Sequence, residues 1–135
     1  MSEADAETLR RSYEDLNRGD AGAALEALHP DGVWRESPEL PGGTELSGRE
    51  AVLGFLEDFL AQWREFRQEV EDTVVAGDRV GVLIHLTAVG RASGIEVDTR
   101  YAHVWTMRDG KGVEVDAYRD PVVAMRHLGV STESK

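Results

Sequence analysis

Hydrophobic residues along this chain change their spacing near residue 63, from the three- and four-residue period of helices to the alternation of strands. Before that point the pattern predicts three helices. The first covers residues 3–18, with an apolar face made of Ala6, Leu9, Tyr13 and Leu16. The second is short, starts from an Asp20 N-cap and ends at Pro30. The third carries the broadest apolar stripe: Val52, Phe55, Leu56, Phe59, Leu60 and Trp63.

Between the second and third helices the pattern is weaker. Residues 31–37 indicate a short strand, and residues 37–48, with two prolines and three glycines, indicate an irregular segment. Ser47 and Glu50 have the spacing of a capping box, so we expect Ser47 to be the N-cap of the third helix.

After residue 63 the alternation predicts a meander of antiparallel strands, with turns at 76–79, 91–94 and 109–110. Asp120 and Pro121 then open a short helix that Gly129 ends, and the tail 131–135 is expected to fray. Helices followed by strands indicate an α+β fold. We expect one domain over 1–135, ordered over about 3–129: a cone in which helices cover a curved antiparallel sheet.

Composition narrows the class of partner. The net charge of -11 argues against nucleic acid and anionic membranes, because phosphate binding requires clustered cations. The chain has no cysteine, which excludes thiolate chemistry and is compatible with a cytoplasmic location. The N-terminus lacks the apolar stretch of a signal peptide, and no run reaches the ~20 apolar residues of a membrane helix.

The strongest candidate for chemistry lies on the strand predicted at 95–107, where Tyr101, His103 and Trp105 share one face. His103 can donate or accept a proton near neutral pH, although a buried core histidine is an equal alternative. Glu36 is the second candidate, since a partly desolvated carboxylate can abstract a proton next to a carbonyl. The alternative for Glu36 is a rim charge paired with Arg35 or Arg49. As an acid–base pair, His103 and Glu36 must converge within one substrate width.

Further candidates could bind a ligand rather than react with it, though core packing or surface ion pairs are the plainer roles for them. They are Trp34, Tyr13, Tyr101, Trp105, Arg119 and Phe55. The four histidines have no metal-ligand spacing and the glycines form no phosphate loop, so we expect no metal and no cofactor.

The chain resembles the NTF2-like superfamily, and within it the SnoaL-like group of polyketide cyclases and ketosteroid-isomerase-like proteins. Four segments carry the resemblance in order: YEDLNRGD, LHPDGVWRESPELPGG, LSGREAVLGF and YAHVWTMRDGKGVEVDAYRD. It implies a cone with an interior pocket and a homodimer formed through the outer face of the sheet, where His85 and Thr87 are expected.

The resemblance also matches individual catalytic residues of related enzymes to positions in this chain. The general-base Asp of ketosteroid isomerases falls on Glu36 or Ser37, and their protonated Asp falls on His103. Their helix Tyr falls on Ser12, beside Tyr13. The Asp of the related epoxide hydrolases falls on Ala117, so neither catalytic set is intact. Two hypotheses remain: cofactor-free isomerisation, cyclisation or dehydration of a small apolar ligand, or a non-catalytic binding or dimerising module.

Overall fold

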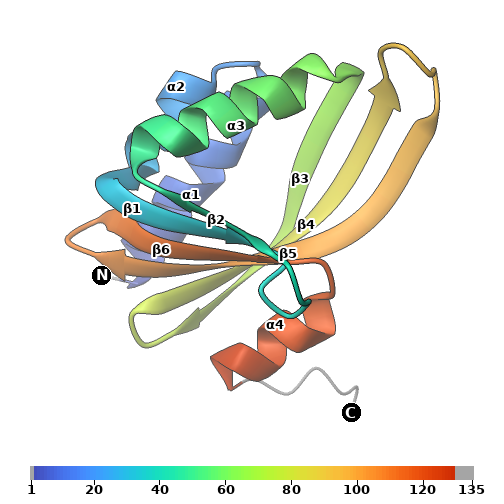
Figure 1. The fold of residues 1–135 in the computed structure, drawn as a ribbon. Coiled ribbons are helices and arrows are strands. Elements are labelled where there is room, and N and C mark those ends of the chain that lie inside the picture. Colours follow the sequence, from blue (N-terminus) through green and yellow to red (C-terminus); the bar gives the residue numbers. More distant parts are fainter. Residues whose placement is uncertain (1, 130–135) are drawn as a thin grey trace.

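The computed structural model describes residues 2–129, so the expected fraying of 131–135 lies outside the described residues. The predicted α+β fold is confirmed, with three helices before the strands β3–β6 and one after them (Figure 1). The elements are α1 (Ser2–Asn17), α2 (Ala21–Ala24), η1 (Leu25–Ala27), β1 (Leu28–Glu36), β2 (Thr44–Ser47), α3 (Arg49–Ala61), β3 (Trp63–Ala76), β4 (Arg79–Gly90), β5 (Glu96–Arg108), β6 (Lys111–Tyr118) and α4 (Pro121–Leu128).

The six strands form one strongly curved sheet in the order β2-β1-β6-β5-β4-β3 (Figure 1). The strands β3 to β6 form the predicted antiparallel meander. The sheet as a whole is mixed, however, because β1 pairs with β6 in parallel. These two strands are joined through the whole meander rather than by a hairpin, so their relative direction is set by tertiary packing.

The two faces of the sheet pack against different helices. The helices α1, α2 and α3 cover the concave face, and their apolar residues form one core with the inner faces of β1, β4, β5 and β6. On the outer face, α4 packs a second cluster around Ala102, Val104 and Met125. Gly81 of β4 permits this, since a Cβ there would overlap the Leu128 side chain. The helix α4 therefore covers part of the face where a dimer contact was expected.

Three helix boundaries differ from the prediction: the end of the second helix and both ends of the third. The second helix starts from Asp20 as expected, with the Asp20 carboxylate accepting from the Ala23 amide at 2.9 Å. It tightens into a 3₁₀ turn, and the chain is already a strand at Leu28, so Pro30 lies within β1. The pairing of β1 with β6 is irregular between Leu28 and Val33, and an irregular stretch tolerates a residue that has no N–H to donate.

The prediction that Ser47 is the N-cap of the third helix was wrong, and so was the prediction that residues 37–48 are irregular throughout. Ser47 belongs to β2 and pairs with Val33 of β1, while Gly48, at φ 94°, is the N-cap of α3 and makes no side-chain cap. Trp63, expected in the third helix, begins β3. Pairing with distant strands determined these conformations, and local propensity does not encode such pairing.

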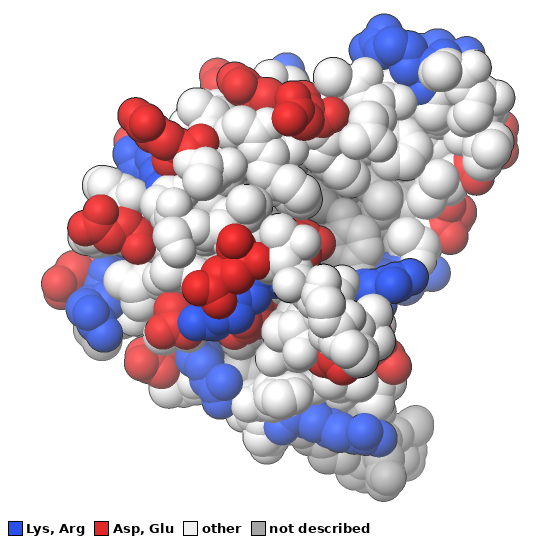
Figure 2. All heavy atoms as spheres, in the orientation of Figure 1, with Lys and Arg blue, Asp and Glu red and all other residues white. Residues whose placement is uncertain are grey.

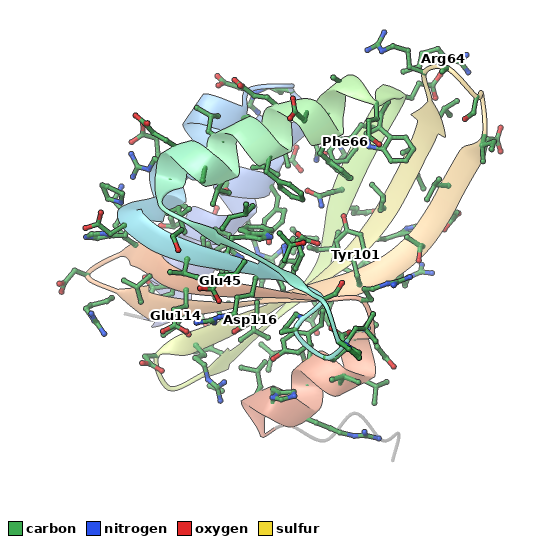
Figure 3. All side chains as sticks on the ribbon, in the orientation of Figure 1. Glu45, Arg64, Phe66, Tyr101, Glu114 and Asp116 are labelled. Carbon is green, nitrogen blue, oxygen red and sulfur yellow. The ribbon has the colours of Figure 1, made fainter. Side chains whose placement is uncertain are left out.

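Charged side chains of both signs are scattered over the face drawn in Figure 2, and no Asp, Glu, Lys or Arg is buried among the described residues. Arg35 of β1 pairs with Glu45 of β2 and with Glu114 and Asp116 of β6, which ties three strands together on one face (Figure 3). Within residues 2–129, no helix combines the length and apolar character needed to cross a membrane.

Candidate functional site

A cavity of about 770 Å³ lies between the concave face of the sheet and the helices, with a lining that is mostly apolar. Figure 2 shows the surface hollowed beside α3, with mainly uncharged atoms around the hollow. All eight residues proposed from the sequence line this cavity: Tyr13, Trp34, Glu36, Phe55, Tyr101, His103, Trp105 and Arg119. They come from α1, β1, α3, β5 and the end of β6, so only the folded chain brings them together.

Sheet register places Glu36 and His103 in one row across the cavity. Glu36 of β1 pairs with Ala117 of β6, and Ala117 pairs in turn with His103 of β5. At about 4.8 Å per strand, the backbones of Glu36 and His103 are about 9–10 Å apart. The small Ala117 side chain between them leaves space for a ligand, so the two candidates flank the same volume.

A chain of hydrogen bonds fixes the orientation of His103. The indole N–H of Trp105 donates to the Tyr13 hydroxyl oxygen at 3.0 Å, and that hydroxyl lies 2.5 Å from His103 Nδ1. An indole nitrogen can only donate, so the Tyr13 oxygen accepts from Trp105, and the direction of its bond with His103 Nδ1 depends on the His103 tautomer. We assign His103 the tautomer protonated on Nε2, because it gives the buried Tyr13 proton an acceptor in Nδ1. Among residues 2–129 no side chain or backbone group forms a hydrogen bond with Nε2.

Burial makes His103 a neutral side chain. It is only 6% exposed, and desolvation by burial lowers its pKa to about 3, because the charged imidazolium loses its hydration. The same burial raises the pKa of Tyr13 well above its ordinary range, so Tyr13 keeps its proton. His103 can therefore donate a hydrogen bond through Nε2–H, but it does not store a second proton at neutral pH.

Glu36 is held differently. Burial raises its pKa, and the hydrogen bond from the Trp34 indole to Oε2, at 2.6 Å, partly offsets that shift. The proposed ion pairs with Arg35 and Arg49 are absent among the described residues, since Arg35 bonds Glu114 and Asp116 while Arg49 donates to the Leu28 carbonyl. Of the two positions left open by the resemblance, Glu36 lines the cavity and Ser37 does not.

Aromatic rings enclose His103. Tyr101 stacks on it at 5.4 Å between centroids, and Trp34 meets it edge-on at 5.1 Å. Trp34 also packs edge-on against Trp105 at 6.2 Å. Arg119 lies at the exposed rim, and no ion pair joins its side chain to an acidic residue within 2–129.

Gln68 was missed from the sequence. It is 4% exposed, lines the cavity from β3, and its side-chain nitrogen donates to the Tyr101 hydroxyl. Its backbone N–H and carbonyl both bond the Asn17 side chain of α1, at 2.7 and 2.9 Å. The available signal was its place between Phe66 and Val70, on the inward period of a strand where a polar residue is unusual.

Within residues 2–129, no group of three His, Asp or Glu side chains is arranged to hold a metal ion. The cavity therefore offers a carboxyl group, a neutral imidazole and tyrosine hydroxyls on an apolar background.

Comparisons with known proteins agree with this architecture. IdmH from Streptomyces antibioticus, a proposed polyketide cyclase, is 26% identical, with a TM-score of 0.73 over 93% of this chain and 99% of that one. TerC, co-crystallised with polyporic acid, is 23% identical, with a TM-score of 0.74 over 93% and 98%. An NTF2-like protein of unknown function from Burkholderia pseudomallei is 24% identical, with a TM-score of 0.76 over 93% and 97%.

A search of curated proteins gave no match. The sequence profile of the SnoaL-like domain, in contrast, matches residues 9–115, which span α1 to β6 and include most of the cavity. The chain belongs to the SnoaL-like domain family and has the fold of the NTF2-like protein described above.

Proposed function

We propose that this protein binds a small, largely apolar carbonyl compound in the cavity and moves a proton on it without a cofactor. The reaction class is isomerisation, aldol cyclisation or dehydration. A volume of about 770 Å³ and a mostly apolar lining with a few polar groups are typical of small-molecule sites. The likeness to IdmH, a proposed polyketide cyclase, supports a polyketide-like ligand.

Glu36 is the general base in this proposal. Oε2 is held by Trp34, which leaves Oε1 to take a proton from the carbon next to the ligand carbonyl. The electron pair of the broken C–H bond moves into the carbonyl and forms an enolate. A carboxylate with a raised pKa is a better base than an exposed one. Glu36 then delivers the proton to a different carbon, which completes isomerisation. In cyclisation the enolate carbon attacks a second carbonyl and the resulting alkoxide takes the proton from Glu36, and in dehydration a β-hydroxyl leaves with that proton as water.

His103 stabilises the enolate oxygen. Because Nδ1 faces Tyr13, Nε2–H is the group left to donate to the developing negative charge. A neutral, preoriented donor in a buried site is an effective electrophile, since it needs no reorganisation as the charge develops. The observation that carries the proposal is the row Glu36–Ala117–His103, in which a base and a donor flank one unfilled position.

Deuterium exchange tests this proposal without knowledge of the natural substrate. 2-Tetralone is flat, apolar and acidic next to its carbonyl, and NMR in D₂O follows the loss of its protons. Wild-type protein should exceed the buffer rate. Glu36→Gln should lower the protein-dependent rate about 100-fold or more, the usual contribution of a general base. His103→Ala should lower it by about the same factor, as expected for loss of an oxyanion donor.

Glu57→Gln is the matched control, because Glu57 is exposed on α3, outside the cavity lining. It should exchange at the wild-type rate. Full activity in Glu36→Gln would refute the assignment of the base. If wild-type protein binds 2-tetralone but never exceeds the buffer rate, the protein is a ligand carrier. That function would agree with Ala117, which stands where the related epoxide hydrolases have a catalytic Asp.

A further inference from the structure

The two cavity tyrosines share one arrangement of hydrogen bonds. The Tyr13 oxygen accepts from Trp105, and the Tyr101 oxygen accepts from the side-chain amide of Gln68. A hydroxyl has a single proton, so when a fixed donor occupies its oxygen the proton is directed elsewhere. Tyr13 directs its proton to His103. For Tyr101, no residue in 2–129 accepts the proton, although Tyr101 lines the cavity.

Gln68 is well placed to hold Tyr101 in this state. The Asn17 side chain of α1 donates to the Gln68 carbonyl and accepts from the Gln68 backbone N–H, which fixes this part of β3 against α1. The Gln68 side-chain amide is buried and donates a hydrogen bond to the Tyr101 hydroxyl oxygen. The amide oxygen has no partner among the described residues, so the Tyr101 interaction is the one hydrogen bond that fixes the amide orientation.

Tyr101 also lies beside the proposed donor. Its ring stacks on His103 with 25° between the planes, and Figure 3 shows it rising from β5 into the space below α3. Burial raises the pKa of Tyr101 to about 12, so the hydroxyl is protonated at neutral pH. The cavity therefore offers a second O–H or N–H donor next to His103 Nε2–H.

We infer that Tyr101 is a further catalytic residue, whose O–H donates to the same enolate oxygen as His103, and that Gln68 is its positioning residue. This inference rests on the proposed proton transfer. Tyr101 keeps its proton throughout and acts as a hydrogen-bond donor, so no bond to it forms or breaks. Tyr101 of β5 has this role because the hydroxyl of the other tyrosine beside His103, Tyr13 of α1, already donates to His103.

Two probes test it: the exchange rate of 2-tetralone, and the affinity for 2-naphthol, a flat mimic of the enol, measured by fluorescence titration. Tyr101→Phe should lower the exchange rate about tenfold to 100-fold. The same variant should weaken the binding of 2-naphthol about tenfold, while the KM for 2-tetralone changes less than twofold. Glu57→Gln, on the exposed face of α3 outside the cavity lining, should change neither quantity.

Gln68 variants separate positioning from simple packing. Gln68→Glu replaces the donor with an acceptor, which captures the Tyr101 proton and should reduce exchange as far as Tyr101→Phe does. Gln68→Met leaves that proton free and should reduce exchange less than fivefold. Gln62→Glu, at the exposed end of α3, is the matched control and should exchange at the wild-type rate.

The outcomes distinguish this inference from the proposed function. If wild-type protein neither exchanges 2-tetralone nor binds 2-naphthol, both proposals fall. If exchange depends on Glu36 but Tyr101→Phe stays within twofold of wild type, only the role of Tyr101 is overturned. Equal effects of Gln68→Glu and Gln68→Met would overturn the positioning role, and Tyr101→Phe still decides the main point should either Gln68 variant fail to fold.

Discussion

Replacing Tyr13 by Phe should destabilise the protein by far more than the loss of one oxygen atom suggests. The Tyr13 hydroxyl joins two buried groups, the Trp105 indole N–H and His103 Nδ1, which are 2% and 6% exposed. Tyr13→Phe leaves both without a partner. Each unsatisfied buried group costs about 1–3 kcal/mol. Allowing for the hydroxyl that Phe no longer buries, we expect a loss of about 2–4 kcal/mol.

Urea unfolding followed by tryptophan fluorescence measures this loss, and a thermal melt should show a fall of roughly 6–12 °C for a domain of this size. Imidazole ¹⁵N shifts provide a second readout. In wild-type protein His103 should be neutral and protonated on Nε2, whereas Tyr13→Phe should let the two tautomers mix.

Tyr118→Phe is the control, because it makes the same chemical change at a buried tyrosine whose hydroxyl has no hydrogen bond within residues 2–129. It should cost less than about 0.5 kcal/mol. If Tyr13→Phe costs no more than Tyr118→Phe, or if the His103 tautomer is unchanged, the hydrogen-bond chain does not fix His103 and the reasoning above fails.

Three further predictions concern packing, pH and assembly. Gly112→Ala should cost about 1–3 kcal/mol, because the added Cβ would overlap the Trp105 ring, and near-UV circular dichroism should report the displaced indole. The pKa of His103 falls from 6.5 to about 3 on folding, so between those values the unfolded chain binds a proton that the folded chain does not. The free energy of unfolding should therefore decrease as pH falls, by up to about 1.4 kcal/mol per pH unit. Urea unfolding at pH values from 6 to 4 measures this decrease, which should be smaller per pH unit in His103→Gln than in the wild-type protein. A homodimer through the uncovered part of the outer sheet face should give twice the mass of one chain in light scattering, and a single-chain mass would contradict it.

Local patterns predicted the elements that depend on neighbouring residues. The N-cap of α4 is Asp120, whose carboxylate accepts from the Val122 amide at 2.9 Å. The helix ends at Gly129, which has a left-handed backbone conformation. The tight turn at Asp109 and Gly110 has positive φ at both residues, as an Asp-Gly hairpin requires. These features are satisfied within a few residues of chain, so composition and spacing alone are enough to predict them.

Candidate site residues were partly predictable for the same reason. Alternation placed Tyr101, His103 and Trp105 on one face, and they line one cavity. Gln68 could not be assigned a partner, since Tyr101 lies 33 positions away and meets it through the pairing of β3, β4 and β5. Nothing in local spacing shows which distant donor a buried amide will find.

By itself the sequence determined the order of the helices and of every strand except β2, the inward face of the long strand and the family to which the chain belongs. Tertiary structure alone decided the rest. It paired β1 with β6 in parallel and so aligned Glu36, Ala117 and His103 in one row. It also buried His103 against Tyr13, which lowers the pKa and fixes the tautomer. Strand register and desolvation depend on contacts between segments far apart in the chain, so neither is determined by local spacing.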